Sequence, residues 1–171
     1  SLSQAVKSPV NLVLPFWIAY DEAGATFLQE IKAAVSGITV MSYRADGALA
    51  AAFAQPLLHW GMTAGKPVRI ALEAGPVAPE SEETFIAATA GQLALQQKDG
   101  QVMATLLPRI TVVAGARMYA SRGAVVTRPE RISFLGNEPK MIEAAEDVAQ
   151  VSSAWTSFAG VALHGLSWPG L

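Results

Sequence analysis

The segment Ile38-Thr39-Val40-Met41-Ser42-Tyr43 is a continuous run of apolar and small residues, without the alternation that marks a half-exposed strand. Such a run predicts a β-strand buried on both faces, as the strands of parallel sheets are. Residues 10–20 and 158–164 are similarly apolar, and residues 68–73 are apolar apart from Arg69 and Glu73. Pro15 predicts that regular pairing of the first strand stops near that residue. These four runs decide the fold class.

Helix signals separate the four predicted strands. After the first strand, Phe27, Leu28 and Ile31 recur at helical spacing, and Asp21 precedes them as a candidate N-cap. An Ala-rich helical segment follows residues 38–43, and another with one apolar face precedes residues 158–164. Strand–helix alternation with short connections requires parallel strands joined by right-handed crossovers. The pattern therefore predicts an α/β protein, either a barrel or a doubly wound sheet.

Residues 84–135 do not follow this pattern. The segments 93–97 and 101–106 are strand-like and flank an Asp-Gly turn, and shorter runs follow up to residue 135. We interpret residues 84–135 as an antiparallel β excursion inserted after the third parallel strand. The competing interpretation is a helix over residues 87–97, which Ala and Gln favour but Gly91 and the turn oppose. The predicted organisation is βα units at residues 1–83, the excursion at 84–135, and a closing helix with the last strand at 136–171.

Composition excludes several classes of protein. Hydrophobic residues make up 51% of the 171 residues, which is too apolar for a disordered chain. The net charge of -2, without a block of Lys or Arg, predicts no nucleic-acid partner and no anionic membrane surface. The longest apolar stretches fall short of the ~20 residues of a membrane helix, and no signal-peptide pattern is visible. The absence of cysteine excludes disulfides and thiolate nucleophiles and leaves the compartment open.

Polar and aromatic residues stand at the carboxyl ends of all four predicted parallel strands, where ligands bind in α/β folds. They are Trp17 after the first strand, Tyr43, Arg44 and Asp46 after the second, Glu73 after the third, and His164 with Trp168 after the fourth. Because parallel strands end at one edge of a sheet, these side chains are expected to form one site.

Glu73 and His164 are the candidate catalytic residues. A carboxylate at the end of a buried strand must be hydrogen-bonded, paired with a cation, or protonated. Arg44 on the neighbouring strand would hold Glu73 ionised as a nucleophile, whereas an apolar wall would raise its pKa for general acid work. Glu73 alternatively forms only a salt bridge with Arg44 or caps a loop. His164 either donates to a hydroxyl or transfers a proton, or it is a structural group.

The other residues of this set are candidates for substrate binding. Tyr43 and Arg44 would orient a substrate by a phenol hydrogen bond and a guanidinium fork, unless Arg44 only neutralises nearby carboxylates. Trp17 and Trp168 would make flat platforms for a sugar face, although core packing explains either equally well. Asp46 is also a candidate for substrate binding, and the alternative is that it only caps the helix that follows it.

Metal and nucleotide sites lack support in the sequence. The sequence has two histidines, His59 and His164, and their spacing matches no pattern of metal ligands. Neither a glycine-rich phosphate loop nor a Gly-x-Ser-x-Gly nucleophile elbow occurs. We therefore expect no cofactor and no metal.

Residues 10–75 and 132–168 resemble the last four strands of glycosidase-like (β/α)8 barrels, a TIM-barrel superfamily. The likeness is to uncharacterised bacterial barrels with a Met-x-Tyr-Arg strand, here residues 41–44, and a closing Phe-x-Gly-x-Ala-x-His strand, here residues 158–164. The resemblance implies half of a TIM-type barrel, with Tyr43, Arg44, Glu73 and His164 facing the barrel mouth. Because a complete barrel takes ~250 residues, it also implies a missing N-terminal half or a homo-oligomer partner.

The function expected from this resemblance is a carbohydrate-active, hydrolase-like protein that hydrolyses or binds a glycan at the rim of its strands. Glycoside hydrolysis needs two carboxylates that flank the bond. The second would come from Asp21, Glu22, Asp46 or a segment outside this sequence. The alternative is a non-catalytic binding or assembly module with a degenerate site. The expected partner in both cases is a carbohydrate or another small polar ligand.

Overall fold

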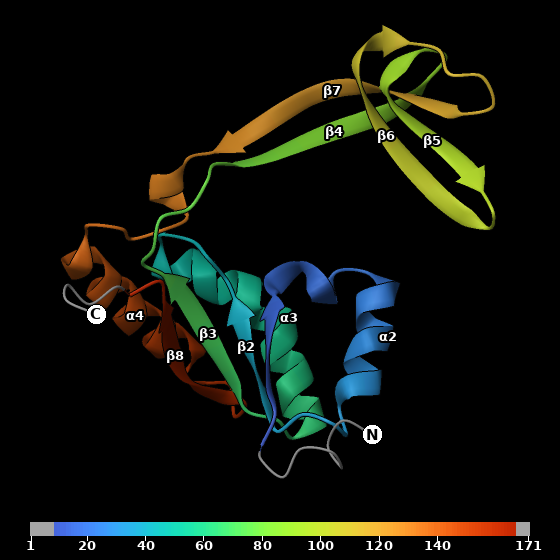
Figure 1. The fold of residues 1–171 in the computed structure, drawn as a ribbon. Coiled ribbons are helices and arrows are strands. Elements are labelled where there is room, and N and C mark those ends of the chain that lie inside the picture. Colours follow the sequence, from blue (N-terminus) through green and yellow to red (C-terminus); the bar gives the residue numbers. More distant parts are fainter. Residues whose placement is uncertain (1–8, 167–171) are drawn as a thin grey trace. The chain divides into compact units, whose positions relative to one another are not determined.

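The computed structural model describes residues 9–166, which form two units (Figure 1). The second unit consists of Pro79–Arg128, and the first contains the described residues on either side of that segment. Each unit is built on one four-stranded β-sheet. The second unit is therefore an insertion into the chain of the first.

The sheet of the first unit consists of parallel strands in the order β1-β2-β3-β8. The strands are β1 at Asn11–Pro15, β2 at Gly37–Met41, β3 at Val68–Glu73 and β8 at Phe158–His164. Val40 on β2 lies opposite Leu14 on β1 and Ile70 on β3, while Glu73 lies opposite His164. Each apolar run of the sequence thus contains one of these strands, and all four carboxyl ends point the same way. Pro15 is the last residue of β1, as expected for a residue without an N–H.

The helices of this unit are α-helices, each capped by a side chain, and short 3-10 helices. They are the 3-10 helix η1 at Phe16–Ala19, α2 at Glu22–Ile31, α3 at Gly47–Ala64, the 3-10 helix η2 at Pro129–Arg131 and α4 at Glu138–Ser152. Asp21 caps α2, Asp46 caps α3 and Asn137 caps α4, each by accepting a hydrogen bond from a backbone N–H in the first turn. Gly65, in the left-handed conformation with φ of 65°, ends α3.

The three α-helices and one face of the parallel sheet share an apolar core. Alternate residues of the two central strands, such as Val40 and Ile70, belong to it together with Leu57 from α3 and Val148 from α4. Because side chains alternate along a strand, the intervening positions point to the other face. Glu73 ends β3 at one of those positions.

The prediction of half a TIM-type barrel is wrong. The structure is a mixed α/β fold with one four-stranded parallel sheet and a separate four-stranded antiparallel sheet. Apolar runs between helices identify parallel strands, but closure into a barrel depends on strand number, tilt and stagger, which such runs do not specify. The expectation of a missing half or a barrel-completing partner depended on the barrel and has no support from this sheet.

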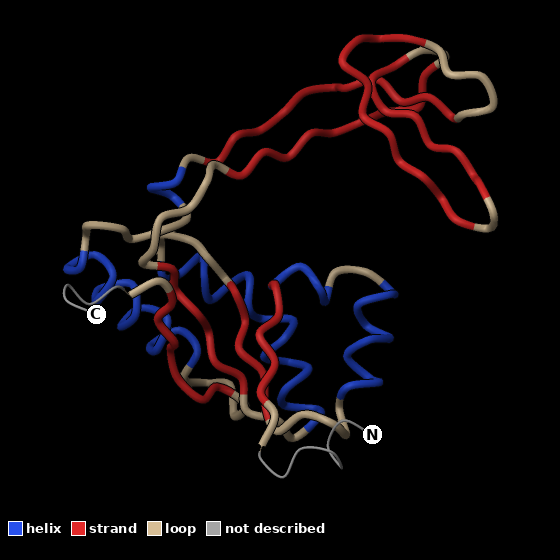
Figure 2. The backbone as a smooth tube through the Cα atoms, in the orientation of Figure 1, coloured by secondary structure: helices blue, strands red, loops and turns tan. Residues whose placement is uncertain are grey.

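The second unit is an antiparallel sheet with the strand order β4-β7-β5-β6 (Figure 2). Its strands are β4 at Glu80–Ala88, β5 at Gly91–Lys98, β6 at Gln101–Thr111 and β7 at Arg117–Thr127. Asp99 and Gly100, both with positive φ, form the two-residue turn between β5 and β6. The helix considered for residues 87–97 is absent, because that segment contains the end of β4 and most of β5.

The boundary of the insertion differs from the predicted range of residues 84–135. The inserted unit ends at Arg128, and the buried residues Ile132 and Phe134 belong to the first unit. Ser133 forms a parallel bridge with Glu73 at the end of β3. The short apolar run at residues 132–135 therefore lies alongside the end of the inner strand β3, beyond the last paired residue of β2, instead of joining the antiparallel sheet.

Candidate functional site

Tyr43, Glu73 and His164 come together at the carboxyl ends of β2, β3 and β8. Glu73 pairs with His164, and Tyr43 follows the end of β2, two residues after Met41, which pairs with Ala71. Glu73 and His164 occupy strand positions that point away from the helices. Ser42, just before Tyr43, bonds instead to the carbonyl of Ala50 in α3. We call Tyr43, Glu73 and His164 the rim cluster. The register and the alternation of side chains together explain why it forms.

The hydroxyl of Tyr43 lies 2.6 Å from Nδ1 of His164, and the two rings meet edge to face. Burial raises the pKa of the Tyr43 phenol above its ordinary value of 10.0, and the nearby Glu73 charge raises it further. Tyr43 is therefore protonated at neutral pH, and the imidazole tautomer sets the direction of its hydrogen bond with His164. In the tautomer with the proton on Nε2, Tyr43 donates to Nδ1 and Nε2 is left as a donor.

Glu73 is buried, with 9% of its surface exposed, and its carboxylate is held by the backbone. Its Oε1 accepts a hydrogen bond of 2.6 Å from the N–H of Gly75. The strand end is fixed on both sides as well, because Phe134 donates to the carbonyl of Glu73 and Ala74 donates to that of His164. These contacts hold the carboxylate in one position beside Tyr43.

Two glycines make the space around this carboxylate. A Cβ on Gly165 would collide with Oε1 of Glu73 and with the backbone of Gly75, and Gly165 also has a φ of +70°. Gly75 packs against the same oxygen. The sequence analysis did not identify these residues. A glycine within two residues of a polar strand end nevertheless indicates a close approach of the backbone.

Ser133 is a further residue that the sequence analysis missed. It is 6% exposed, its hydroxyl donates to the carbonyl of Gly75 at 2.6 Å, and it accepts from the N–H of Leu135. Ser133 thus joins the segment after η2 to the loop after β3. The sequence analysis missed Ser133 because it assigned residues 84–135 to the antiparallel excursion.

Arg44 makes contacts other than the predicted pairing with Glu73. Its guanidinium carbon lies 5.4 Å from the ring centre of Phe16 and 5.1 Å from that of Phe53, and Nη1 donates to the carbonyl of Tyr43. The two rings are themselves stacked, with centres 4.7 Å apart. A guanidinium on an aromatic face is a stabilising cation–π contact, so Arg44 anchors the chain after β2 to η1 and α3.

The remaining predicted site residues lie apart from the rim cluster or outside the described residues. The carboxylates of Asp21 and Asp46 bind the N–H groups of Gly24 and Leu49 as helix caps, which is the alternative considered for Asp46. Trp17 lies in η1 after β1 and is 56% exposed. Trp168 lies outside the described residues.

A hollow of about 400 Å³ adjoins the rim cluster through Ser133. Besides Ser133, its lining contains three side chains that can hydrogen-bond, those of Glu130, Asn137 and Lys140, together with the apolar Phe134 and other residues. This volume falls in the range of small-molecule sites, roughly 300–1,000 Å³. This hollow belongs to the first unit and lies beside predicted site residues.

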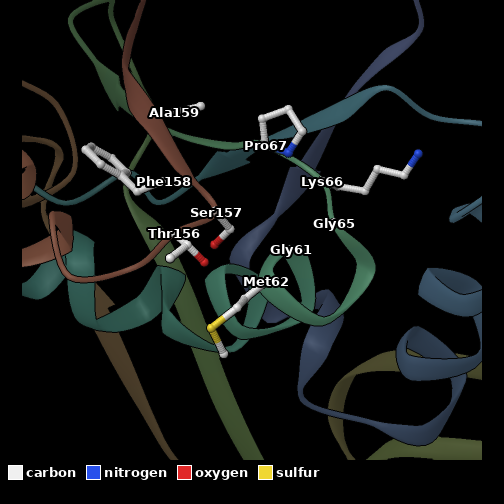
Figure 3. A pocket seen from close by; sticks show the side chains of 9 residues that line it. All are labelled: Gly61, Met62, Gly65, Lys66, Pro67, Thr156, Ser157, Phe158 and Ala159. Carbon is white, nitrogen blue, oxygen red and sulfur yellow. The ribbon is translucent and has the colours of Figure 1, made fainter.

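Another hollow, of about 370 Å³, lies at the amino ends of β3 and β8 (Figure 3). Met62 and Ser157 line it, and the side chain of Lys66 extends away from it. Ser157 donates to the carbonyl of Leu58 and Lys66 to that of Val35, so both polar groups serve the packing of the unit. The amino ends of strands in α/β folds usually contribute to stability, and we assign this hollow no site.

Among the described residues, no group of three or more His, Cys, Asp or Glu side chains is arranged to hold a metal ion. No helix in the described part of the chain combines the length and apolarity needed to cross a membrane. Compared with known proteins, the chain matches no family model, no curated protein and no solved structure.

Proposed function

We propose that the first unit binds a carbohydrate or another small polyhydroxy ligand at the carboxyl ends of β2, β3 and β8. The observation that carries the proposal is the hydrogen bond between Tyr43 and His164 beside the carboxylate of Glu73. In the tautomer that accepts this bond, Nε2 of His164 is a donor on the strand next to Glu73, whose carboxylate accepts. A sugar hydroxyl both donates and accepts, so such a pair suits it.

The neighbouring hollow supports a ligand of this size. It is lined by Ser133, which forms a bridge with Glu73, and it adds amide, ammonium and carboxylate side chains from Asn137, Lys140 and Glu130. Small-ligand sites typically combine an apolar lining with a few polar groups that fix orientation. Phe134 provides apolar surface in the same hollow.

The test is a binding titration of the whole chain with a panel of neutral mono- and disaccharides and a linear polyol. Saturation-transfer NMR and calorimetry would detect binding. Tyr43→Phe should weaken it, because the variant loses the hydroxyl that bonds Nδ1 of His164. Tyr119→Phe, in the second unit, is the matched control and should bind like the native chain. If neither sugars nor the polyol bind, or if Tyr43→Phe binds unchanged, the proposal fails.

Hydrolysis of a glycoside is the second candidate function. It is favoured by the burial of Glu73 beside His164, since a buried carboxylate and a proton-carrying group are the parts of general acid–base catalysis. Glycoside hydrolysis normally uses two carboxylates that flank the bond. Asp21 and Asp46, two candidates for the second carboxylate, cap helices and so do not favour this mechanism.

Aryl glycosides with a chromogenic leaving group distinguish hydrolysis from binding. Turnover by the native chain that is lost in Glu73→Gln would support hydrolysis. Binding of sugars without turnover would leave the protein as a binding module. Asp46→Asn keeps its helix cap and is the control, because a carboxylate that only caps α3 is not needed for turnover.

A further inference from the structure

The strand β6 forms an edge of the antiparallel sheet and exposes an unusual amount of apolar surface. Within the described residues β6 is hydrogen-bonded to β5 alone. Val102 and Leu106 are each 69% exposed and Met103 is 50% exposed. An exposed apolar edge strand is a template for pairing with another strand, and proteins normally protect such edges with charges. Between Gln101 and Leu106 this strand has no charge.

The hairpin geometry determines which backbone groups of β6 are unpaired. In a two-residue hairpin the residues that flank the turn, here Lys98 and Gln101, exchange hydrogen bonds, and bonded positions then alternate along the strand. The N–H and C=O groups of Val102, Ala104 and Leu106 consequently point away from β5. Pro108 has no N–H and limits the ladder that a new strand could form.

We propose that a second copy of this chain pairs with β6, antiparallel and across a two-fold axis, to join the two antiparallel sheets. In a continuous antiparallel sheet with such an axis, one residue must pair with its own copy. Ala104 is the middle one of the three outward-pointing residues. Pairing Ala104 with itself places Val102 opposite Leu106 of the second copy, so every outward-pointing group is bonded.

Charge complementarity supports this register. With Ala104 on the axis, the turn residue Asp99 of one copy comes alongside Arg109 of the other, at each end of the new ladder. Both residues are exposed. An opposite-charge pair across strands is stabilising, whereas like charges would oppose the pairing. Moving the axis by one residue, to Met103, would bring the uncharged Gln97 alongside Arg109.

The opposite edge of the sheet explains why the assembly stops at two copies. The edge strand β4 carries Glu80, Glu82 and Glu83 within four residues. Self-pairing of such a strand would bring carboxylates together, and charges of this kind protect sheet edges. The joined sheet would therefore end in an acidic strand on both sides, and the result is a closed dimer.

Sedimentation velocity of the full-length chain tests the proposal. The native chain should sediment as a dimer that dissociates on dilution. Ala104→Lys and Ala104→Glu should each be monomeric, because the substituted residue faces its own copy. An equimolar mixture of these two variants should recover the dimer. Val125→Lys is the matched control: Val125 is also 69% exposed in the second unit, but it lies on β7, and the variant should remain dimeric.

A cysteine variant makes the test independent of how well the charged variants fold. The native chain has no cysteine, so Ala104→Cys introduces the only thiol. Hydrogen-bonded antiparallel partners have Cα atoms about 5.5 Å apart, within the range that a disulfide spans. Mild oxidation should give a covalent dimer of Ala104→Cys but not of Val125→Cys. A native chain that is monomeric at all concentrations, a dimeric Ala104→Lys, or equal cross-linking of both cysteine variants would overturn the proposal.

Discussion

The Tyr43 hydroxyl reaches Nδ1 of His164, 2.6 Å away, over the end of β3, which separates the strands that carry the two residues. This hydrogen bond connects two strands that share no backbone pairing. It also lies beside the charge of Glu73, which together with burial favours the neutral phenol. The state of protonation of Tyr43 is thus coupled to the folded structure.

The first prediction concerns stability at alkaline pH. Because the pKa of Tyr43 is raised in the folded chain above the 10.0 of an unfolded one, its stabilising effect is complete below pH 10.0 and is lost as the pH rises through the folded value. Denaturant unfolding at neutral and alkaline pH should show this loss in the native chain and in Tyr119→Phe. Tyr43→Phe should lack that component. Parallel losses in all three chains would contradict the prediction.

The second prediction concerns Gly165. Gly165→Ala should lower the free energy of unfolding by more than the about 1–2 kcal/mol expected for a left-handed alanine, because its Cβ also collides with the Glu73 carboxylate. Gly136→Ala is the control, since Gly136 has a φ of +72° but open space around it. Urea unfolding of both variants measures the difference. Equal losses would show that the contact with Glu73 is not tight.

Ser133 offers a third prediction. Ser133→Ala removes a buried hydroxyl and leaves the carbonyl of Gly75 and the N–H of Leu135 without their bonds. The expected cost is about 1–3 kcal/mol in the free energy of unfolding. Ser153→Ala is the comparison, because that exposed hydroxyl only bonds a carbonyl of its own helix, and a change near zero is expected. An unchanged stability of Ser133→Ala would show that solvent replaces these bonds.

A fourth prediction separates capping from ligand binding at Asp46. Asp46→Ala should destabilise the chain by about 0.5–2 kcal/mol, since it removes the acceptor of the Leu49 N–H. Asp46→Asn keeps a good cap and should be close to the native chain in thermal unfolding. Both variants should bind ligand like the native chain. Weaker binding by Asp46→Asn would instead assign the carboxylate to the ligand, as the sequence analysis had predicted.

Local patterns predicted the strands well because the relevant forces are local. Each uninterrupted apolar run contains a parallel strand, and the ends of three runs supply Tyr43, Glu73 and His164. Side-chain alternation along a strand, counted from the buried positions, is enough to place these three residues on one face. The sequence therefore contained the rim cluster, although the barrel inferred around it is wrong.

The missed features depend on contacts between distant segments. The guanidinium of Arg44 lies near the rings of Phe16 and Phe53, which the sequence analysis did not predict, and its pairing with Glu73 stays a prediction. Neither ring could be assigned to Arg44 without knowing how η1 and α3 pack. Ser133 was counted with the antiparallel strands, because an apolar run of four residues does not reveal which sheet it will pair with.

The ladder between β4 and β7 has a consequence for the order of folding. Glu80 pairs with Thr127, so the two ends of the inserted unit are held side by side by its own hydrogen bonds. Joining β8 to β3 then closes a loop made up of residues 74–79 and 128–157 instead of one that also spans the insertion, and each halving of loop length saves about 0.6 kcal/mol of chain entropy. Early pairing of β4 with β7 would accordingly speed the docking of β8, and a break in that ladder would delay completion of a sheet in which neither strand takes part.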